Sequence, residues 1–189
     1  MVYFLDFYFS NFTQWFSIFA GSFDGQHIEF FKITHNVFYF NNCSEVLLQN
    51  VSVEGSNLDS LINFESTNIS ILDFSIQDSI GVSLITGFNS VINLESLLVS
   101  NTSFNSFVSI SFSHLIAALI QSHLSIFTDK LMSIYNSTII FQEFLVANVS
   151  SITFLTSFDS TALFENTIIK HFDFQLFLNL RQSKVTFHN

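Results

Sequence analysis

The sequence predicts an all-β solenoid, in which each coil has about 23 residues and three short strands. The first observation is a repeat: residues 136–143 return as residues 159–166, with fainter copies at 43–50, 67–73, 89–96 and 182–189. The second is one shared apolar position, which recurs at a nearly constant interval as Val46, Ile69, Ile92, Leu115, Ile139, Ala162 and Val185. The third is composition, with 27 Phe and no Pro, because a central strand cannot lose its backbone donor.

Residues 1–20 differ from the repeat and have the pattern of an amphipathic helix. At about 100° per residue, one face collects Phe4, Tyr8, Phe12, Trp15, Phe16 and Phe19, and polar residues fall opposite. The segment has no Lys or Arg, which a signal peptide or a membrane-surface helix should carry. We expect a helix that caps the open end of a solenoid over residues 21–189. A leader and a membrane element are the alternatives.

From about Phe23 the repeat sets the order of elements within each coil. The shared apolar residue and the second residue after it alternate as in a strand; these second residues are Leu48, Ile71, Leu94, Ala117, Phe141, Phe164 and Phe187. After a polar break comes another apolar pair: Val51/Val53, Phe74/Ile76, Leu97/Val99 and Phe144/Val146. A third pair follows: Ile62/Phe64, Val108/Ile110, Met132/Ile134 and Leu178/Leu180. Three short strands per coil, each ended by a turn-forming residue, account for this pattern.

Stacked coils place equivalent side chains about 4.8 Å apart, so that like packs on like inside the solenoid. We expect ladders such as Phe141, Phe164 and Phe187, in which each buried side chain contributes about 1.5–3 kcal/mol. Seven coils and a fraction fit between Phe23 and Asn189, and the last stops after its first strand. Because an uncapped end pairs with other chains, we expect the chain to be a fragment of a longer array.

The coil at residues 113–123 lacks the polar break. A helix face would also fit its apolar residues: Leu115, Ile116, Leu119, Ile120 and His123. Residues 108–127 are also the nearest approach to a transmembrane span, although two histidines, a glutamine and many serines make it a poor one. We expect a pair of strands with an unusually apolar corner, covered by a neighbouring loop.

Charge and cysteine content exclude several kinds of partner. The net charge is −10 with 5 basic residues, which leaves no basic patch for a nucleic acid or an anionic membrane surface. Cys43 is the single cysteine, so there is no internal disulfide. Neither a metal nor a cofactor is expected, because there is no Gly-rich phosphate loop and the histidines form no zinc pattern: His27, His35, His114, His123, His171 and His188.

Seven sequons for N-glycosylation favour the secretory route, and hence an extracellular or cell-surface location. They begin at Asn11, Asn42, Asn50, Asn68, Asn101, Asn136 and Asn148. A chain this rich in Asn, Ser and Thr also forms several such triplets by chance.

The recurring Asn-Ser-x-Ile-x-Phe segments, their period and the apolar ladders resemble right-handed parallel β-helix proteins of the pectate-lyase-like superfamily. The resemblance covers about residues 23–189 and is to the long repetitive surface proteins of that shape. It implies a right-handed parallel β-helix of three sheets. For activity it implies a wide range: polysaccharide lyases, polygalacturonases, pectin esterases, phage tailspikes, adhesins and proteins of unknown role.

The enzymes of that superfamily carry clustered carboxylates beside Arg, Lys or His, and this chain departs from them. It has no Asp-Asp pair, no Gly-His-Gly or Arg-x-Lys segment, and its sole arginine is Arg181. The best carboxylates lie in the polar break: Asp73, Glu95, Glu143 and Glu165. Neighbouring coils should bring together the first two and the last two, as a two-carboxylate hydrolase or a Ca²⁺ site requires. The alternative is a solvated turn in which acidic residues mark the surface.

Three functions follow from these patterns. The first is a structural or interaction module of a secreted or cell-surface protein, which presents polar ladders to a carbohydrate or protein partner. The second is a carbohydrate-active enzyme, a lyase or hydrolase, that uses the acidic residues. The third is a membrane-attached protein, through residues 1–20 or 108–127. A non-enzymatic role is our expectation, and the apolar residues Leu98, Ile116 and Ile140 suggest that a partner or further sequence covers an outer face.

Overall fold

A computed structural model describes residues 2–10, 16–34 and 38–188 of the chain. In these ranges the backbone forms strands and no helix, so the predicted all-β class is confirmed. The strands are β1 (Val2–Ser10), β2 (Phe16–Phe31), β3 (Phe38–Glu54), β4 (Asn57–Glu65), β5 (Asn68–Gln77), β6 (Ile80–Phe88), β7 (Val91–Ser100), β8 (Ser103–Ser111), β9 (His114–Tyr135), β10 (Thr138–Phe158), β11 (Thr161–Glu165), β12 (Ile168–Arg181) and β13 (Lys184–His188).

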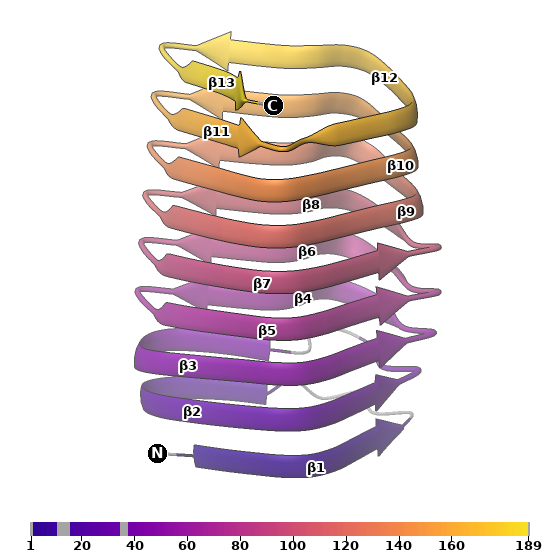
Figure 1. Ribbon diagram of the computed structural model, residues 1–189. Coiled ribbons are helices and arrows are strands. Elements are labelled where there is room, and N and C mark those ends of the chain that lie inside the picture. Colours follow the sequence, from indigo (N-terminus) through magenta and orange to yellow (C-terminus); the bar gives the residue numbers. More distant parts are fainter. Residues whose placement is uncertain (1, 11–15, 35–37, 189) are drawn as a thin grey trace.

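The strands pair in parallel as the stacked coils of a solenoid, with the two termini at opposite ends of the column (Figure 1). Val46 of β3 pairs with Ile69 of β5, and Ile69 pairs with Ile92 of β7. The same row continues to Val185 of β13. The predicted solenoid, with coils of about 23 residues, is therefore confirmed. The handedness of the coil and its division into three sheets stay predictions.

Apolar ladders fill the interior of the column. Phe141, Phe164 and Phe187 are in register, and their rings stack at centroid distances of 5.3 and 4.9 Å. The predicted apolar pairs are buried, except in β12 and β13. There Leu178 and Val185 are half-buried, and Leu180 and Phe187 are exposed. Because each coil repeats the inward pattern of its neighbour, every core side chain packs on an equivalent one above and below.

In each coil a residue with a left-handed backbone recurs at three positions, and we call these positions corners. The first corner is formed by His27, Asn50, Asp73, Ser96, Leu119, Glu143 and Asn166. The second corner is formed by Lys32, Gly55, Asp78, Asn101, Leu124, Asn148 and His171. The third corner is formed by Asn42, Ser66, Asn89, Phe112, Asn136, Asp159 and Gln182. Asn, Asp and Gly recur there because they adopt this conformation at the lowest cost, which explains the predicted polar breaks.

A column of buried hydroxyl groups closes the third corner. The residue after that corner is Cys43, Thr67, Ser90, Ser113, Ser137, Ser160 or Ser183. From Thr67 onward, each hydroxyl accepts a hydrogen bond from the backbone N–H of the preceding coil and donates one to the carbonyl two residues before it. Ser56, Ser79, Thr102 and Ser125 form a shorter column after the second corner. The recurring Asn-Ser pair is thus a left-handed residue followed by a buried hydroxyl that satisfies the corner's backbone.

The helix predicted over residues 1–20 is wrong for Val2–Ser10, which forms β1, and for residues 16–20, which belong to β2. Strand β1 pairs in parallel with β2, from Val2 opposite Phe23 to Ser10 opposite Phe31. The run has only two polar residues, Asp6 and Ser10, so its hydrophobic period does not separate helix from strand. The backbone of β2 decides the outcome, because it offers hydrogen bonds along the whole segment. Residues 11–15 of the predicted helix lie outside the described ranges.

The apolar coil at residues 113–123 is extended, as predicted, and opens β9. The prediction that a loop covers its corner is wrong for the described residues, because Leu119 is 42% exposed and Leu124, at the next corner, is 55% exposed. Leu98 and Ile116 are exposed too, whereas Ile140 is half-buried. No helix in the described ranges has the length and apolar character needed to cross a membrane.

Candidate functional site

The four predicted carboxylates lie at or beside the first corner. Asp73 and Glu143 are corner residues, and Glu95 and Glu165 each precede one. Register places Glu95 opposite the residue before Asp73, and Glu165 opposite the residue before Glu143. The two members of each predicted pair therefore lie on neighbouring coils, and their positions differ by one residue in register. The coil with Leu119 at this corner separates one pair from the other.

This acidic corner is an exposed row of side chains. Asp73, Glu95 and Glu143 are exposed, and the Glu165 carboxylate accepts a hydrogen bond from Gln142 Nε2 at 3.3 Å. The arginine that could stabilise a sugar acid is elsewhere, since Arg181 precedes the third corner. Among the described residues, no group of three His, Cys, Asp or Glu is placed to hold a metal ion. The arrangement resembles a solvated turn more than an enclosed catalytic centre.

The main irregularity in the middle of the column is in β9. Thr128 and Asp129 together oppose Asn105 of β8 on one side and Ile152 of β10 on the other. This extra residue is a β-bulge, and it explains why the interval from Leu115 to Ile139 in the core row is longer by one than the other intervals. Bulges re-aim side chains and are over-represented beside functional sites.

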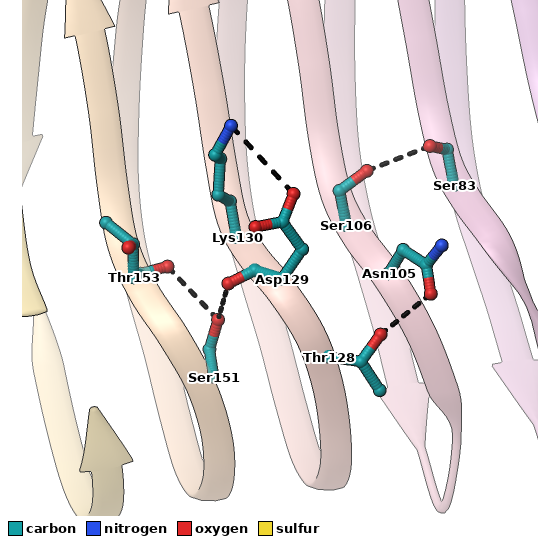
Figure 2. A network of polar contacts seen from close by, with 8 residues as sticks. All are labelled: Ser83, Asn105, Ser106, Thr128, Asp129, Lys130, Ser151 and Thr153. Atoms are coloured by element: carbon teal, nitrogen blue, oxygen red, sulfur yellow. Dashed lines mark hydrogen bonds and ion pairs between the residues drawn. The ribbon is translucent and has the colours of Figure 1, made fainter. Parts of the chain in front are cut away.

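Polar side chains gather around the bulge on neighbouring coils (Figure 2). They are Ser83, Asn105, Ser106, Thr128, Asp129, Lys130, Ser151 and Thr153. Thr128 Oγ1 donates a hydrogen bond to Asn105 Oδ1 at 2.7 Å. The buried hydroxyl of Ser151 lies 3.2 Å from the Asp129 carbonyl and 3.1 Å from the Thr153 carbonyl. These contacts fix the bulge to the coils on both sides.

A groove of about 280 Å³ opens beside the bulge, and we call it the bulge groove. It is lined by Ile126, Phe127, Thr128, Ser150, Ser151, Ile152, Asp173 and Gln175, from β9, β10 and β12. Ile126 and Ile152 are exposed apolar side chains, whereas Asp173 and Gln175 supply an exposed carboxylate and an exposed amide. The groove thus combines apolar surface with hydrogen-bonding groups on a rigid sheet.

The charges around the groove are mainly negative. Asp173 lines it and Asp129 belongs to the bulge, while the nearby Lys130 ammonium lies 3.9 Å from the Asp129 carboxylate. An anionic ligand would meet like charge here. The groove therefore suits a neutral ligand with several hydroxyl groups and an apolar face.

Sequence reasoning missed this groove, because Asp129, Asp173 and Gln175 belong to no repeated motif. One signal could have located it: the single lengthened interval, from Leu115 to Ile139, in a row that is otherwise evenly spaced. An insertion that leaves the following coils in register must form a bulge within its own coil.

The sequon asparagines lie mostly at corners. Five of them have left-handed backbones: Asn42, Asn50, Asn101, Asn136 and Asn148. These five and Asn68 are exposed, while Asn11 lies outside the described residues. Because corners favour Asn, and Ser and Thr are frequent throughout this chain, corner chemistry also produces Asn-x-Ser/Thr triplets. Glycosylation at these positions stays a prediction.

Comparison with known proteins finds no family model and no curated protein that matches this chain.

Proposed function

We propose that the chain is a non-enzymatic display module of a secreted or cell-surface repeat protein, whose bulge groove binds a neutral carbohydrate. The observation that carries the proposal is the bulge in β9, which interrupts a regular ladder where hydroxyl, amide, carboxylate and apolar side chains meet. The resemblance to repetitive surface proteins of the pectate-lyase-like superfamily supports the same role.

The chemistry of the groove matches that of a pyranose ring. Such a ring has hydroxyl groups around its rim and C–H groups on its faces. Asp173 and Gln175 can accept and donate hydrogen bonds to the rim, and Ile126 and Ile152 can pack on a face. Polar groups that fix orientation over apolar surface are the usual design of a small-molecule site.

A neutral sugar is favoured over an acidic one by charge. The chain carries a net charge of −10, and both carboxylates near the groove, Asp173 and Asp129, would repel an acidic sugar. A cation that could compensate, Lys130, already lies beside Asp129. We therefore expect uronic-acid polymers to bind more weakly than neutral ones.

Calorimetric titration with neutral oligosaccharides of glucose, xylose, mannose and N-acetylglucosamine, and with oligogalacturonate, tests the proposal. Asp173→Asn removes a charge from the groove, and we expect it to weaken binding of the neutral sugar about tenfold. Deleting Thr128 gives the bulged coil the same length as its neighbours. We expect this deletion to abolish binding and to leave the far-ultraviolet circular dichroism spectrum unchanged.

The matched controls are Glu95→Gln and Glu143→Gln, which alter exposed carboxylates at the first corner. Unchanged affinity is expected for both. Tighter binding of oligogalacturonate than of the neutral sugars would refute the charge argument. Loss of binding in the Glu143→Gln variant alone would place the site at the acidic corner, and either result would refute the proposal.

The proposed location has its own test. Enzymatic removal of N-glycans from the natively produced protein should increase its gel mobility. An unchanged mobility would remove the main support for the secretory route, and the sequons would then reflect corner geometry alone.

A further inference from the structure

Three exposed aromatic rings form a strip along the third corner. Phe88 is 47% exposed, Phe112 is 50% exposed and Tyr135 is 44% exposed. Phe112 lies edge-on between the other two, at centroid distances of 5.6 Å from Phe88 and 5.5 Å from Tyr135. The rings belong to consecutive coils, so the strip runs along the axis of the column.

The middle ring is held by a backbone conformation that phenylalanine rarely adopts. Phe112 has a φ of 51°, in the left-handed region. Every other residue described at this corner is polar: Asn42, Ser66, Asn89, Asn136, Asp159 and Gln182. A bulky residue in this region is an outlier, and such outliers gather where function requires them.

The register of the neighbouring strands shows that the ring of Phe112 fills a gap between two other aromatic rings. Phe88, Ser111 and Tyr135 occupy one row, and Ser111 would leave a gap between the two aromatic rings. Phe112 is the next residue along the chain, and its ring takes the place that the small side chain of Ser111 leaves empty. The strip is therefore continuous only because the corner residue of this coil is aromatic.

One residue of the strip, Tyr135, and one residue of the bulge groove, Thr128, lie on the same stretch of β9, between the second and third corners. Thr128 lines the groove and Tyr135 ends the strand at the third corner, seven residues later. At about 3.3 Å per residue, the two features are about 23 Å apart. A disaccharide in the groove cannot reach the strip, whereas an oligosaccharide of about six sugars can.

We propose that Phe88, Phe112 and Tyr135 form a second contact for the neutral glycan that occupies the bulge groove, by stacking on the apolar faces of its sugar rings. This inference rests on the proposed function and adds a preference for long chains. Aromatic faces carry negative charge density that attracts C–H groups. The exposed Asn89, which follows Phe88 in the chain, supplies an amide for the sugar hydroxyls.

The test compares cellobiose with cellohexaose on the unmodified protein and on Phe112→Asn, by calorimetric titration. Asn is the residue that neighbouring coils carry at this corner, so the urea midpoint of the variant should not fall. We expect the unmodified protein to bind the hexasaccharide about tenfold more tightly than the disaccharide, and Phe112→Asn to lose that difference. Binding of the disaccharide should stay unchanged.

Two further variants control for the possibility that Phe112→Asn weakens binding by disturbing the fold. Phe88→Ser and Tyr135→Ser introduce the residue that the middle coil carries in the same row, and each should weaken hexasaccharide binding alone. Equal affinity for the two sugars in the unmodified protein, or unaltered hexasaccharide binding in Phe112→Asn, would overturn the inference and leave the groove proposal standing. Failure of both sugars, together with every other neutral oligosaccharide, to bind the unmodified protein would overturn both.

Discussion

The buried hydroxyl column makes a prediction that can be worked out from its geometry. Ser137 is 5% exposed and its hydroxyl makes two hydrogen bonds. It accepts one from the Ser113 backbone N–H at 3.1 Å and donates one to the Tyr135 carbonyl at 2.7 Å. Ser137→Ala removes one oxygen atom and both bonds. The cavity that remains is small, so the cost is mainly that of the unpaired polar groups.

The magnitude follows from which groups lose their partners. The Ser113 N–H lies at a buried corner, and a buried donor without an acceptor costs about 1–3 kcal/mol. The Tyr135 carbonyl also loses a donor, which adds about 0.5–1 kcal/mol. We expect Ser137→Ala to lower the free energy of unfolding by about 2–3 kcal/mol, without a change in the surface exposed on unfolding.

Urea denaturation followed by far-ultraviolet circular dichroism measures this change. A lower midpoint with an unchanged slope is expected. Ser109→Ala is the matched control, because Ser109 faces outward on β8 and its hydroxyl makes no hydrogen bond within the described residues. Ser137→Thr should keep the midpoint, since Thr67 fills the same place in another coil. If Ser137→Ala lowered the urea midpoint no more than Ser109→Ala does, the hydroxyl column would not stabilise the corner and the reasoning would be wrong.

Two further substitutions test the interior of the column. Ser122 is buried in a row between Val99 and Val146, and its hydroxyl has no partner among the described residues. We therefore expect Ser122→Val to raise the free energy of unfolding by about 1–3 kcal/mol in the same urea assay, and a loss would contradict the assigned register. A Cβ at Gly81 would lie 2.3 Å from the Leu58 carbonyl oxygen. Gly81→Ala should therefore cost about 1–3 kcal/mol, and more than Gly25→Ala, whose Cβ would meet side-chain atoms of Phe23 and Ile28 and no backbone atom among its three nearest neighbours.

The core of the fold could be predicted from the sequence because a solenoid turns long-range contacts into a constant spacing. Stepping back by one repeat from Ile92 gives its neighbour Ile69, and no knowledge of tertiary structure is needed. The buried partners of Phe141 and Phe164 followed in the same way. The repeat did not predict the pairing of β1, because residues 1–20 were predicted to form a helix outside the repeat. Its pairing with β2 depends on hydrogen bonds that a hydrophobic pattern does not encode.

The corners were visible in the sequence, but their chemistry was not. The Asn-Ser pairs were recognised as a repeat, while the left-handed backbone of Asn136 and the hydrogen bonds of Ser137 require coordinates in space. The predicted acidic residues, such as Asp73 and Glu143, proved to be corner residues. Acidic side chains are common at such positions for conformational reasons, which weakens their value as a signal of catalysis.

One coil concentrates the departures from the repeat, and this concentration is itself an argument about function. From Phe112 to Tyr135 the corner residues are Phe112, Leu119 and Leu124, each left-handed and exposed. Each of these costs about 1–2 kcal/mol in backbone strain, and the same coil contains the bulge at Thr128. A coil needs only to match its two neighbours, so polar corners and the ordinary coil length would have been sufficient for folding. The strained Phe112 and Leu124 and the insertion lie between the second and third corners, where the groove and the aromatic strip are, so these departures agree with the binding role proposed for this face.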